Sequence, residues 1–424
     1  MAGELVTTLT NFHQTKYRDI LNSDVPRASK FSMVVWNRAR KIDLGGTSLN
    51  TTWAHQTAEG VGFGAMTEGG DYPAAGYDSA ENPTLSMTHL AASVMWSGHA
   101  LAAGNKTRYD GERLIRKKAR ALTEQVKKYV ARMFMWDGTD ILCQAGTVSG
   151  TTNGYFTIKS GGCPIHFFEP GQVVTFRDAA SSGTEQLTNA STGGGRIVAI
   201  DPDLGRVYIA DMTGGAADDY IAWANCYDAT LPNGIRNLID SGGTVMGINR
   251  ANAAGAFLRS IEIDHASAAM NHSTVDELRD RVLDQAGLRG EKYATSWVGN
   301  RKMRRWATQA TVGQNRFADL DLTLGIAQVH VNDKDGRKLF IEDEYIIDGE
   351  LYAICPEKFV RGAPEGAEGG AEPVMNGQSP LFQATASSGV GYSDSQLQYV
   401  VWRGNLGIDE GRCHGKTTSI AAPV

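Results

Sequence analysis

Residues 106–136 read KTRYDGERLIRKKARALTEQVKKYVARMFMW, and this stretch decides the fold. Its apolar residues recur at alternating steps of four and three, as on one face of an amphipathic helix. They are Ile115, Ala119, Leu122, Val126, Tyr129 and Met133. A helix of this length measures roughly 45 Å, and Asp137-Gly138 supplies its stop. The opposite face carries the basic residues Arg113, Arg116, Lys117, Arg120, Lys127 and Lys128.

This basic face has two interpretations. It is either a solvated helix surface, or a surface that faces a polyanion or a carboxylate-rich neighbour. In the second case the six basic residues line the interior of an assembly.

Residues 1–105 contrast with the helix. They are polar and Gly-rich, with short apolar pairs such as Val34-Val35 and no sustained helical period. Ordering such a segment costs about 1–2 kcal/mol per residue in backbone entropy. The sequence therefore predicts no core element here, and burial against another copy of the same chain.

Within this region we expect a long two-stranded ribbon. Residues 48–56 and 83–96 are rich in Thr, Val, Met and Trp, and the Gly- and Pro-punctuated residues 68–78 are typical of a loop tip. An isolated ribbon is marginal in water, so this one needs a surface on which to lie. Aromatic residues often contribute most of the binding energy of an interface. The candidate residues for contacts between subunits are therefore Trp36, Trp53, Tyr72, Tyr77 and Trp96.

The second half of the chain predicts two further units. Five short strand-like runs between 147 and 228 favour a small barrel or sandwich inserted as a unit. From 231 to 360 helices and strands mix. Thr274 to Glu277 has the spacing of a capping box, residues 300–310 predict a helix, and residues 327–331, 339–343 and 350–354 predict strands. Residues 396–402 alternate as a returning strand.

Composition excludes several classes of protein. The 424 residues are 42% hydrophobic and 21% charged, as in ordinary soluble proteins. The net charge of −6 gives no global basic field for nucleic acid. The five scattered cysteines form no CxxC pair and indicate reduced thiols of a cytoplasmically made protein. There is neither a signal-peptide pattern nor a long apolar run.

No motif predicts a catalytic, cofactor or metal site. Gly411 to Gly415 has three intervening residues where a phosphate-binding loop needs four, so we expect a turn before a terminal strand. The glycines at 60, 62 and 64 lack the dinucleotide-binding pattern. The basic residues 300–306 predict a solvated or interface-facing helix rather than a nucleic-acid contact. The acidic run 342–344 predicts a strand with a charged outer face.

The order of parts and two local sequences carry a resemblance. Tyr399-Val-Val-Trp402-Arg-Gly404-Asn-Leu-Gly407 with Gly415-Lys-Thr417, and Pro232-Asn-Gly-Ile-Arg-Asn-Leu238, look like the last strands and the axial-domain entry of one family. The chain resembles the major capsid protein of tailed bacteriophages, whose fold is shared with encapsulins and the herpesvirus capsid floor.

The resemblance implies an α+β fold of six parts. These are an N-terminal arm (1–50), an extended β loop (51–104), a spine helix in a peripheral domain (105–146), an inserted barrel-like β domain (147–228), a mixed α/β axial domain (229–395) and return strands of the peripheral domain (396–424). Between Lys41 and Lys106 there is no lysine. Some relatives join their subunits by a Lys–Asn isopeptide bond with the lysine on the extended loop, and such a bond is therefore not expected here.

The implied function is a structural, non-enzymatic subunit of an icosahedral shell around packaged double-stranded DNA, made in the host cytoplasm and located in the virion. Implied partners are other copies in pentamers and hexamers, a separate scaffolding protein, a portal, a decoration protein and DNA held without sequence specificity. No membrane is involved. The alternatives are an encapsulin-like compartment shell and a β-rich phage tail or binding protein.

Overall fold

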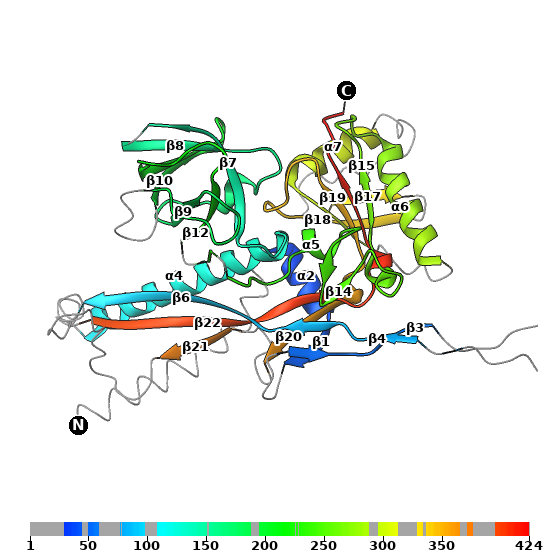
Figure 1. Cartoon of the computed structure of the whole chain (residues 1–424), viewed down its shortest axis with the longest axis horizontal. Coiled ribbons are helices and arrows are strands. Elements are labelled where there is room, and N and C mark those ends of the chain that lie inside the picture. Colours follow the sequence, from blue (N-terminus) through cyan, green and yellow to red (C-terminus); the bar gives the residue numbers. More distant parts are fainter. Residues whose placement is uncertain are drawn as a thin grey trace, which may run out of the picture.

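The structure is a computed structural model that describes residues 29–44, 50–58, 77, 79–97, 108–150, 152–187, 195–224, 226–227, 229–287, 296–312, 329–333, 336–364, 371–375 and 395–423. These residues form three units (Figure 1). A long sheet runs along the base with a helix beside it, a barrel lies above one end, and a mixed α/β body lies above the other.

The helix of the base is α4 (Arg108–Met135), close to the predicted 106–136. Its C-terminal half is buried through Val126, Val130, Met133 and Phe134. The apolar positions Ile115, Ala119 and Leu122, like the basic Arg113, Arg116, Lys117 and Arg120, have side chains outside the described set.

Strand β22 (Ser395–Ile408) organises the sheet beside α4, and it extends the predicted return strand at both ends. Its first part pairs antiparallel with β6 (Thr88–Ser97), from Ser395 opposite Ser97 to Gly404 opposite Thr88. On its other edge lie β21 (Ala371–Met375) and β20 (Phe359–Pro364), and β20 pairs in parallel with β1 (Arg40–Leu44). One strand therefore joins most of the base.

Helix α2 (Lys30–Arg38) contradicts the prediction that the first hundred residues hold no core element. Ser29 and Ser32 form a reciprocal capping box, in which Ser29 Oγ accepts from the Ser32 N–H at 3.1 Å. The helix buries Phe31, Val35 and Trp36. Only three large apolar side chains in nine residues define its buried face, too few to show a period in the sequence.

Trp36 also corrects a predicted site. Its side chain is 2% exposed, stacks on Phe134 of α4 at 5.5 Å and lies 6.2 Å from the ring of Trp402 on β22. A residue this deeply buried in its own chain has almost no surface left for a neighbour. Trp36 therefore holds α2 against the base and is not a subunit contact.

The β segment is a closed barrel in the order β10-β11-β8-β7-β12-β9. Its strands are β7 (Ile141–Ser149), β8 (Thr152–Ile158), β9 (Val173–Arg177), β10 (Gly195–Asp201), β11 (Arg206–Asp211) and β12 (Tyr220–Trp223). Five strands match predicted runs. The sixth, β7, begins at Ile141, before the expected start at 147, because the chain enters the barrel directly after the turn at Gly138 (φ 80°).

The mixed body has a six-stranded sheet in the order β15-β23-β19-β16-β18-β17. Its strands are β15 (Ile261–Asp264), β16 (Ser296–Gly299), β17 (Val329–Asp333), β18 (Gly336–Glu342), β19 (Leu351–Ile354) and β23 (Gly415–Thr418). Helices α6 (His272–Ala286) and α7 (Arg301–Val312) pack against it. The two predicted helices, the three predicted strands and the terminal strand are present.

The predicted capping box of α6 was shifted. The N-cap is Asn271, whose Oδ1 accepts from the Thr274 N–H at 2.9 Å, and Thr274 is the third helical residue rather than the cap. The helix ends at Ala286, and Gly287 with φ 67° is its C-cap. Asn caps a helix as well as Thr does, so the sequence alone allows the helix to start after either Asn271 or Thr274.

Short elements connect the units. They are α5 (Ile235–Leu238), the hairpin β13 (Thr244–Val245) and β14 (Ile248–Asn249), and the one-turn helices η2 (Ile165–Phe167), η3 (Ala256–Leu258), η5 (Pro356–Lys358) and η6 (Gly411–Cys413). Gly234, the N-cap of α5, lies against the end of α4. A Cβ there would come within 1.9 Å of the Trp136 carbonyl oxygen.

Replacing Gly234 by Ala should therefore destabilise the chain. A methyl group has no room against two carbonyl oxygens of the α4 terminus, and overpacking of this kind costs about 1–3 kcal/mol. The matched control is Gly242→Ala, where the nearest atom, Asp240 Oδ1, would be 4.0 Å away and the change should stay within about 0.5 kcal/mol. Urea unfolding of the two variants as unassembled subunits measures the difference in their unfolding free energies. Equal unfolding midpoints for the two variants would contradict the packing of Gly234 against the end of α4.

Candidate assembly surface

The predicted ribbon is present in part: from its second flank, 83–96, residues 84–86 pair within the ribbon, whereas Thr88 onward belongs to β6 and pairs with β22. The predicted tip, 68–78, lies outside the described residues except for Tyr77. Strand β2 (Asn50–Thr52) pairs antiparallel with β5 (Thr84–Ser86), and β3 (His55–Ala58) pairs antiparallel with β4 (Ser79–Glu81). In Figure 1 the ribbon leaves the base below the mixed body and points away from it. Within the described part of the chain, neither pair has a third strand.

The ribbon is fixed to its own chain at one carboxylate. Asp409, just after β22, accepts hydrogen bonds at Oδ1 from Arg40 Nη2 (3.2 Å) and Trp53 Nε1 (3.1 Å). The Nδ1 of His55 lies 3.8 Å from the same oxygen. The His55 imidazole, the Arg40 guanidinium and the Trp53 indole together hold the pKa of Asp409 below its ordinary value.

Further contacts complete this root. The His55 ring stacks on Phe257 of η3 at 4.2 Å, and Leu85 is fully buried. The Thr84 N–H donates to the Met246 carbonyl at 2.9 Å, and Asn405 Nδ2 donates to the Ser86 carbonyl at 2.8 Å. The ribbon is thus anchored at its base by charge, stacking and burial.

The side chains farther along have no such burial. Beyond the pair formed by His55 and Glu81, Ser79 and Ala80 are exposed, and Tyr77, in the predicted tip, is 96% exposed. Such an aromatic side chain has its whole ring surface left for contacts outside the described residues. The structure therefore divides the ribbon into an anchored root and an exposed outer part.

The remaining predicted contact residues have different outcomes. Trp53 is half-buried and belongs to the root through its bond to Asp409. Trp96 lies in β6, opposite Gln396, but its side chain falls outside the described set, as does Tyr72 altogether. Tyr77 is the candidate whose exposure fits a contact with a neighbour.

Two of the six basic side chains on α4 are described, and both have acidic partners. Lys127 pairs with Glu124 and Lys128 with Glu169, each at 3.0 Å. Burial alone would raise the pKa of Glu169, but Lys128 and Arg132 lower it below its ordinary value. The positive charge of this part of the helix is therefore largely offset.

The basic residues of α7 and the acidic run face each other. Arg301 and Arg304 pair with Glu342 at 3.2 and 3.1 Å, and Lys302 pairs with Asp348. The predicted solvated helix face is thus an ion-pair network, in which exposed pairs contribute little individually.

The acidic run differs from the prediction. Strand β18 ends at Glu342, and Asp343 is 3% exposed instead of lying on a charged outer face. Burial raises the pKa of Asp343 to about 6. Its Oδ1 accepts from the Tyr345 N–H at 3.1 Å, which turns the chain out of the strand.

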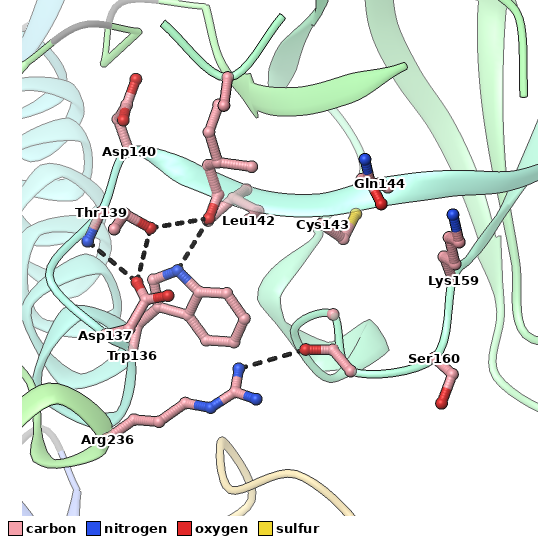
Figure 2. Close-up of a pocket in the computed structure, with 14 residues that line it drawn as sticks. Trp136, Asp137, Thr139, Asp140, Leu142, Cys143, Gln144, Lys159, Ser160 and Arg236 are labelled. Atoms are coloured by element: carbon pink, nitrogen blue, oxygen red, sulfur yellow. Dashed lines mark hydrogen bonds between the residues drawn. The ribbon is translucent and has the colours of Figure 1, made fainter. Parts of the chain in front are cut away.

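A cavity of about 410 Å³ lies where α4 enters the barrel. Figure 2 shows Trp136, Asp137 and Thr139 hydrogen-bonded within the turn that follows α4. The Trp136 indole donates to the Ile141 carbonyl at 2.9 Å, and Asp137 Oδ1 accepts from the Thr139 N–H at 2.9 Å. Arg236 lies 5.0 Å from the Trp136 ring and donates to the Gly161 carbonyl at 3.2 Å. These groups hold the barrel to the body and form no catalytic arrangement.

Next to this cavity, aromatic side chains join all three units. Phe167 of η2 lies 5.6 Å from Trp136, 6.5 Å from Trp223 and 5.7 Å from Tyr345 of the body. Arg132, 1% exposed, pairs with Glu169 at 2.5 Å and lies 5.5 Å from the Tyr345 ring. We call these residues the aromatic junction. Through it the barrel shares one hydrophobic core with the base and the body.

The other sequence motifs have structural roles. Gly411 to Gly415 is the turn η6 leading into β23, as expected, and Lys416 is paired with Asp240 (2.9 Å) and Glu262 (3.1 Å). All five cysteines are free thiols. In the described ranges, no group of three or more His, Cys, Asp or Glu side chains could hold a metal ion, and no helix is long and apolar enough to cross a membrane.

Comparison with known proteins rests on structure. No protein-family model matches the sequence, and no curated protein does. The chain is similar to phage capsid proteins. It matches a chain of the cyanophage A-1(L) capsid asymmetric unit at 12% identity and TM-score 0.45, covering 92% of this chain and 93% of that one.

Two further matches have comparable extent. A chain from the capsid of an empty GTA particle is 10% identical, with 92% and 90% of the two chains covered and a TM-score of 0.42. A chain from the satellite phage P4 procapsid, whose structure includes a size determination protein, is 8% identical, with 99% and 91% covered and a TM-score of 0.39. The matches thus span nearly the whole chain at low identity.

The aromatic junction predicts that the barrel cannot be removed. Replacing residues 141–224 by a short Gly-Ser linker should give an unfolded or insoluble chain, because Trp136 and Tyr345 lose their cover and Arg132 loses Glu169. The control is Leu204→Ser, at an exposed hairpin position, which should keep the wild-type melting temperature. Circular dichroism melting tests both, and a cooperative transition in the deletion variant would show an independent insertion instead.

The Asp409 anchor predicts a pH dependence. Because its folded pKa is lowered, its stabilisation is fully present above the ordinary value near 3.9 and is lost as the pH falls through the lowered pKa. The difference in unfolding free energy between wild type and Asp409→Asn should therefore be largest at neutral pH and shrink towards pH 3. Asp203→Asn, at an exposed turn, is the control, and a pH-independent difference for Asp409 would contradict the anchor.

Proposed function

We propose that this chain is a structural subunit that assembles with many copies of itself into a closed icosahedral shell enclosing packaged double-stranded DNA. The observation that carries the proposal is the ribbon, which is anchored on its own body at Asp409 but continues outward with exposed side chains. A two-stranded ribbon is marginally stable by itself in water. Its outer part gains burial when it lies on another subunit.

Assembly of this kind needs no strong single contact. Each copy contributes several modest contacts, and closure multiplies them because every later contact forms within one particle. The aromatic junction suits this role, because its ring contacts hold the barrel, the base and the body of one subunit together. The role involves no catalysis and no cofactor.

The charge distribution supports a wall that tolerates DNA without binding it tightly. The chain carries a net charge of −6, and Lys127 and Lys128 are paired with carboxylates. Tight binding to a nucleic-acid backbone would need unpaired basic side chains that release counterions. An interior position for Arg113, Arg116, Lys117 and Arg120 remains part of the proposal.

The proposal assigns roles to the units. The base with α4 is the peripheral wall, the ribbon is the extended loop that overlaps a neighbour, the mixed body packs around the five-fold and six-fold centres, and the barrel is an accessory domain. The partners that follow are a separate scaffolding protein, a portal and a decoration protein, with the virion as the location.

Negative-stain electron microscopy of the purified chain tests the assembly directly. Uniform closed particles support the proposal. A monodisperse monomer or small oligomer, across a range of protein concentrations and with molecular crowding agents, would contradict it. Such an oligomer would instead favour the tail or binding-protein alternative.

Shortening the ribbon should block closure without unfolding the subunit. Replacing residues 59–78 by Gly-Asn-Gly removes Tyr77 and keeps the anchored root, so the melting temperature should stay within a few degrees of wild type while closed particles disappear. Tyr77→Phe is the matched control, because it keeps the ring that would be buried on the neighbour. Closed particles of normal size from the shortened chain would disprove the role of the ribbon.

A further inference from the structure

The β10–β11 hairpin of the barrel exposes apolar side chains. Val198 and Leu204 are 53% and 57% exposed, and with Met33 and Tyr77 they are the large apolar side chains that the described residues leave most open. Val198 follows buried Ile197 in the alternation of β10 and therefore points outward, at the position where the pairing with β11 shifts register. Single exposed apolar residues are ordinary, but here two lie on one hairpin.

Aromatic side chains continue this surface onto β8. Tyr208 of β11 lies directly opposite Tyr155 of β8, and their ring centroids are 5.7 Å apart. The neighbouring residues Phe156, Val207 and Ile209 are fully buried in the barrel, so strand alternation places both tyrosines on its outer face. The guanidinium of Arg206 lies 4.3 Å from the Tyr155 ring centroid. We call Tyr155, Val198, Leu204, Arg206 and Tyr208 the barrel patch.

The charge around the patch is unusual for this barrel. Residues 141–224 contain four basic and eight acidic residues, a net charge of −4. Two of the basic residues are paired, Lys159 with Asp218 at 2.7 Å and Arg177 with Glu185 at 3.4 Å. The other two, Arg196 and Arg206, lie on the β10–β11 hairpin, where the strand pairing sets Arg206 opposite Asp201 without an ion pair between the two side chains.

The composition of the patch is that of a protein-binding hot spot. Tyr and Arg are enriched where a few side chains carry most of the binding energy, and each presents a large contact area. Stacking on Tyr155 orients the Arg206 guanidinium before a ligand arrives, which lowers the entropy lost on binding. A carboxylate is the group that this planar donor pairs best.

Two other occupants fit the charges less well. A nucleic acid would meet a barrel with net charge −4, which repels a polyanion. A second copy docked through the same patch would bring Arg206 against Arg206, and like charges in one interface disfavour it. The patch also lies on a different unit from the ribbon (Figure 1).

We infer that the barrel patch is a docking surface for a separate protein that presents a carboxylate beside an aliphatic or aromatic side chain. The carboxylate pairs with Arg206, and the apolar side chain covers Tyr208, Val198 and Leu204. The inference gives the accessory domain of the proposed function a specific partner chemistry. It also holds for a single dispersed subunit, so it can be tested without shells.

The test uses the chain in which Gly-Asn-Gly replaces residues 59–78, because this variant is designed not to form closed particles. The labelled variant is used to select binders from random 12-residue peptides displayed on yeast. Enriched peptides are synthesised and their binding measured by fluorescence anisotropy. We expect Asp or Glu next to Leu, Phe or Tyr in these peptides. Kd should rise about tenfold or more for Arg206→Ala and for Tyr208→Ala, as for hot-spot residues.

Two further variants test whether the loss of binding is specific to the Arg206 guanidinium. Arg206→Lys keeps the charge but loses the planar stacking, and should weaken binding less than Arg206→Ala does. Arg305→Ala, at another exposed arginine, should leave Kd unchanged within twofold. Peptides without an acidic residue, or equal affinity for wild type and Arg206→Ala, would overturn the inference. So would Arg206→Glu abolishing particles of the unshortened chain, because the occupant would then be a second copy.

Discussion

The structure depends on the packing of Phe167 among Trp136, Trp223 and Tyr345. This cluster brings together the end of the long helix, two parts of the barrel and the mixed body, so three units that are separate in sequence share one core. Arg132 adds a buried charge beside it, which is tolerated because Glu169 supplies the counter-charge and the rings of Tyr129 and Tyr345 face the guanidinium. Removing one partner of such a pair typically costs about 3–5 kcal/mol. The relative positions of the units are therefore fixed by side chains rather than by linkers.

The same design appears at the ribbon. Its root is held by one carboxylate, one stacked ring pair and one buried leucine, whereas its outer part has only its own two strands. Asp409 is suited to the anchor because two donors, Arg40 and Trp53, and the His55 imidazole converge on it, which also explains its lowered pKa. A firmly held root with an exposed extension is the arrangement expected of an element that completes its burial outside its own chain.

Much of this architecture could be predicted from the sequence. The α4 stripe from Val126 to Met133, the paired ribbon strands and the hairpins of the barrel follow from local periodicity and turn residues, which do not depend on distant contacts. Helix α2 could not be predicted, because Phe31, Val35 and Trp36 become a recognisable face only when Phe134 and Trp402 cover them. Asp343 was misplaced for a similar reason. Alternation suggested a strand, but the residue is buried beside a turn. The Asp409 anchor joins residues more than 350 positions apart in the chain, and no local pattern records such a contact.

Strand β22 has a mechanical consequence. It pairs with β6 over ten consecutive positions and ends next to Asp409, where the ribbon is attached. A force applied to the ribbon along the strand direction acts on β22. It then loads all the backbone pairs between β22 and β6 in shear at the same time, instead of opening them one after another from one end. Strand pairs resist shear far better than peeling. The base is thus built to carry tension along its length.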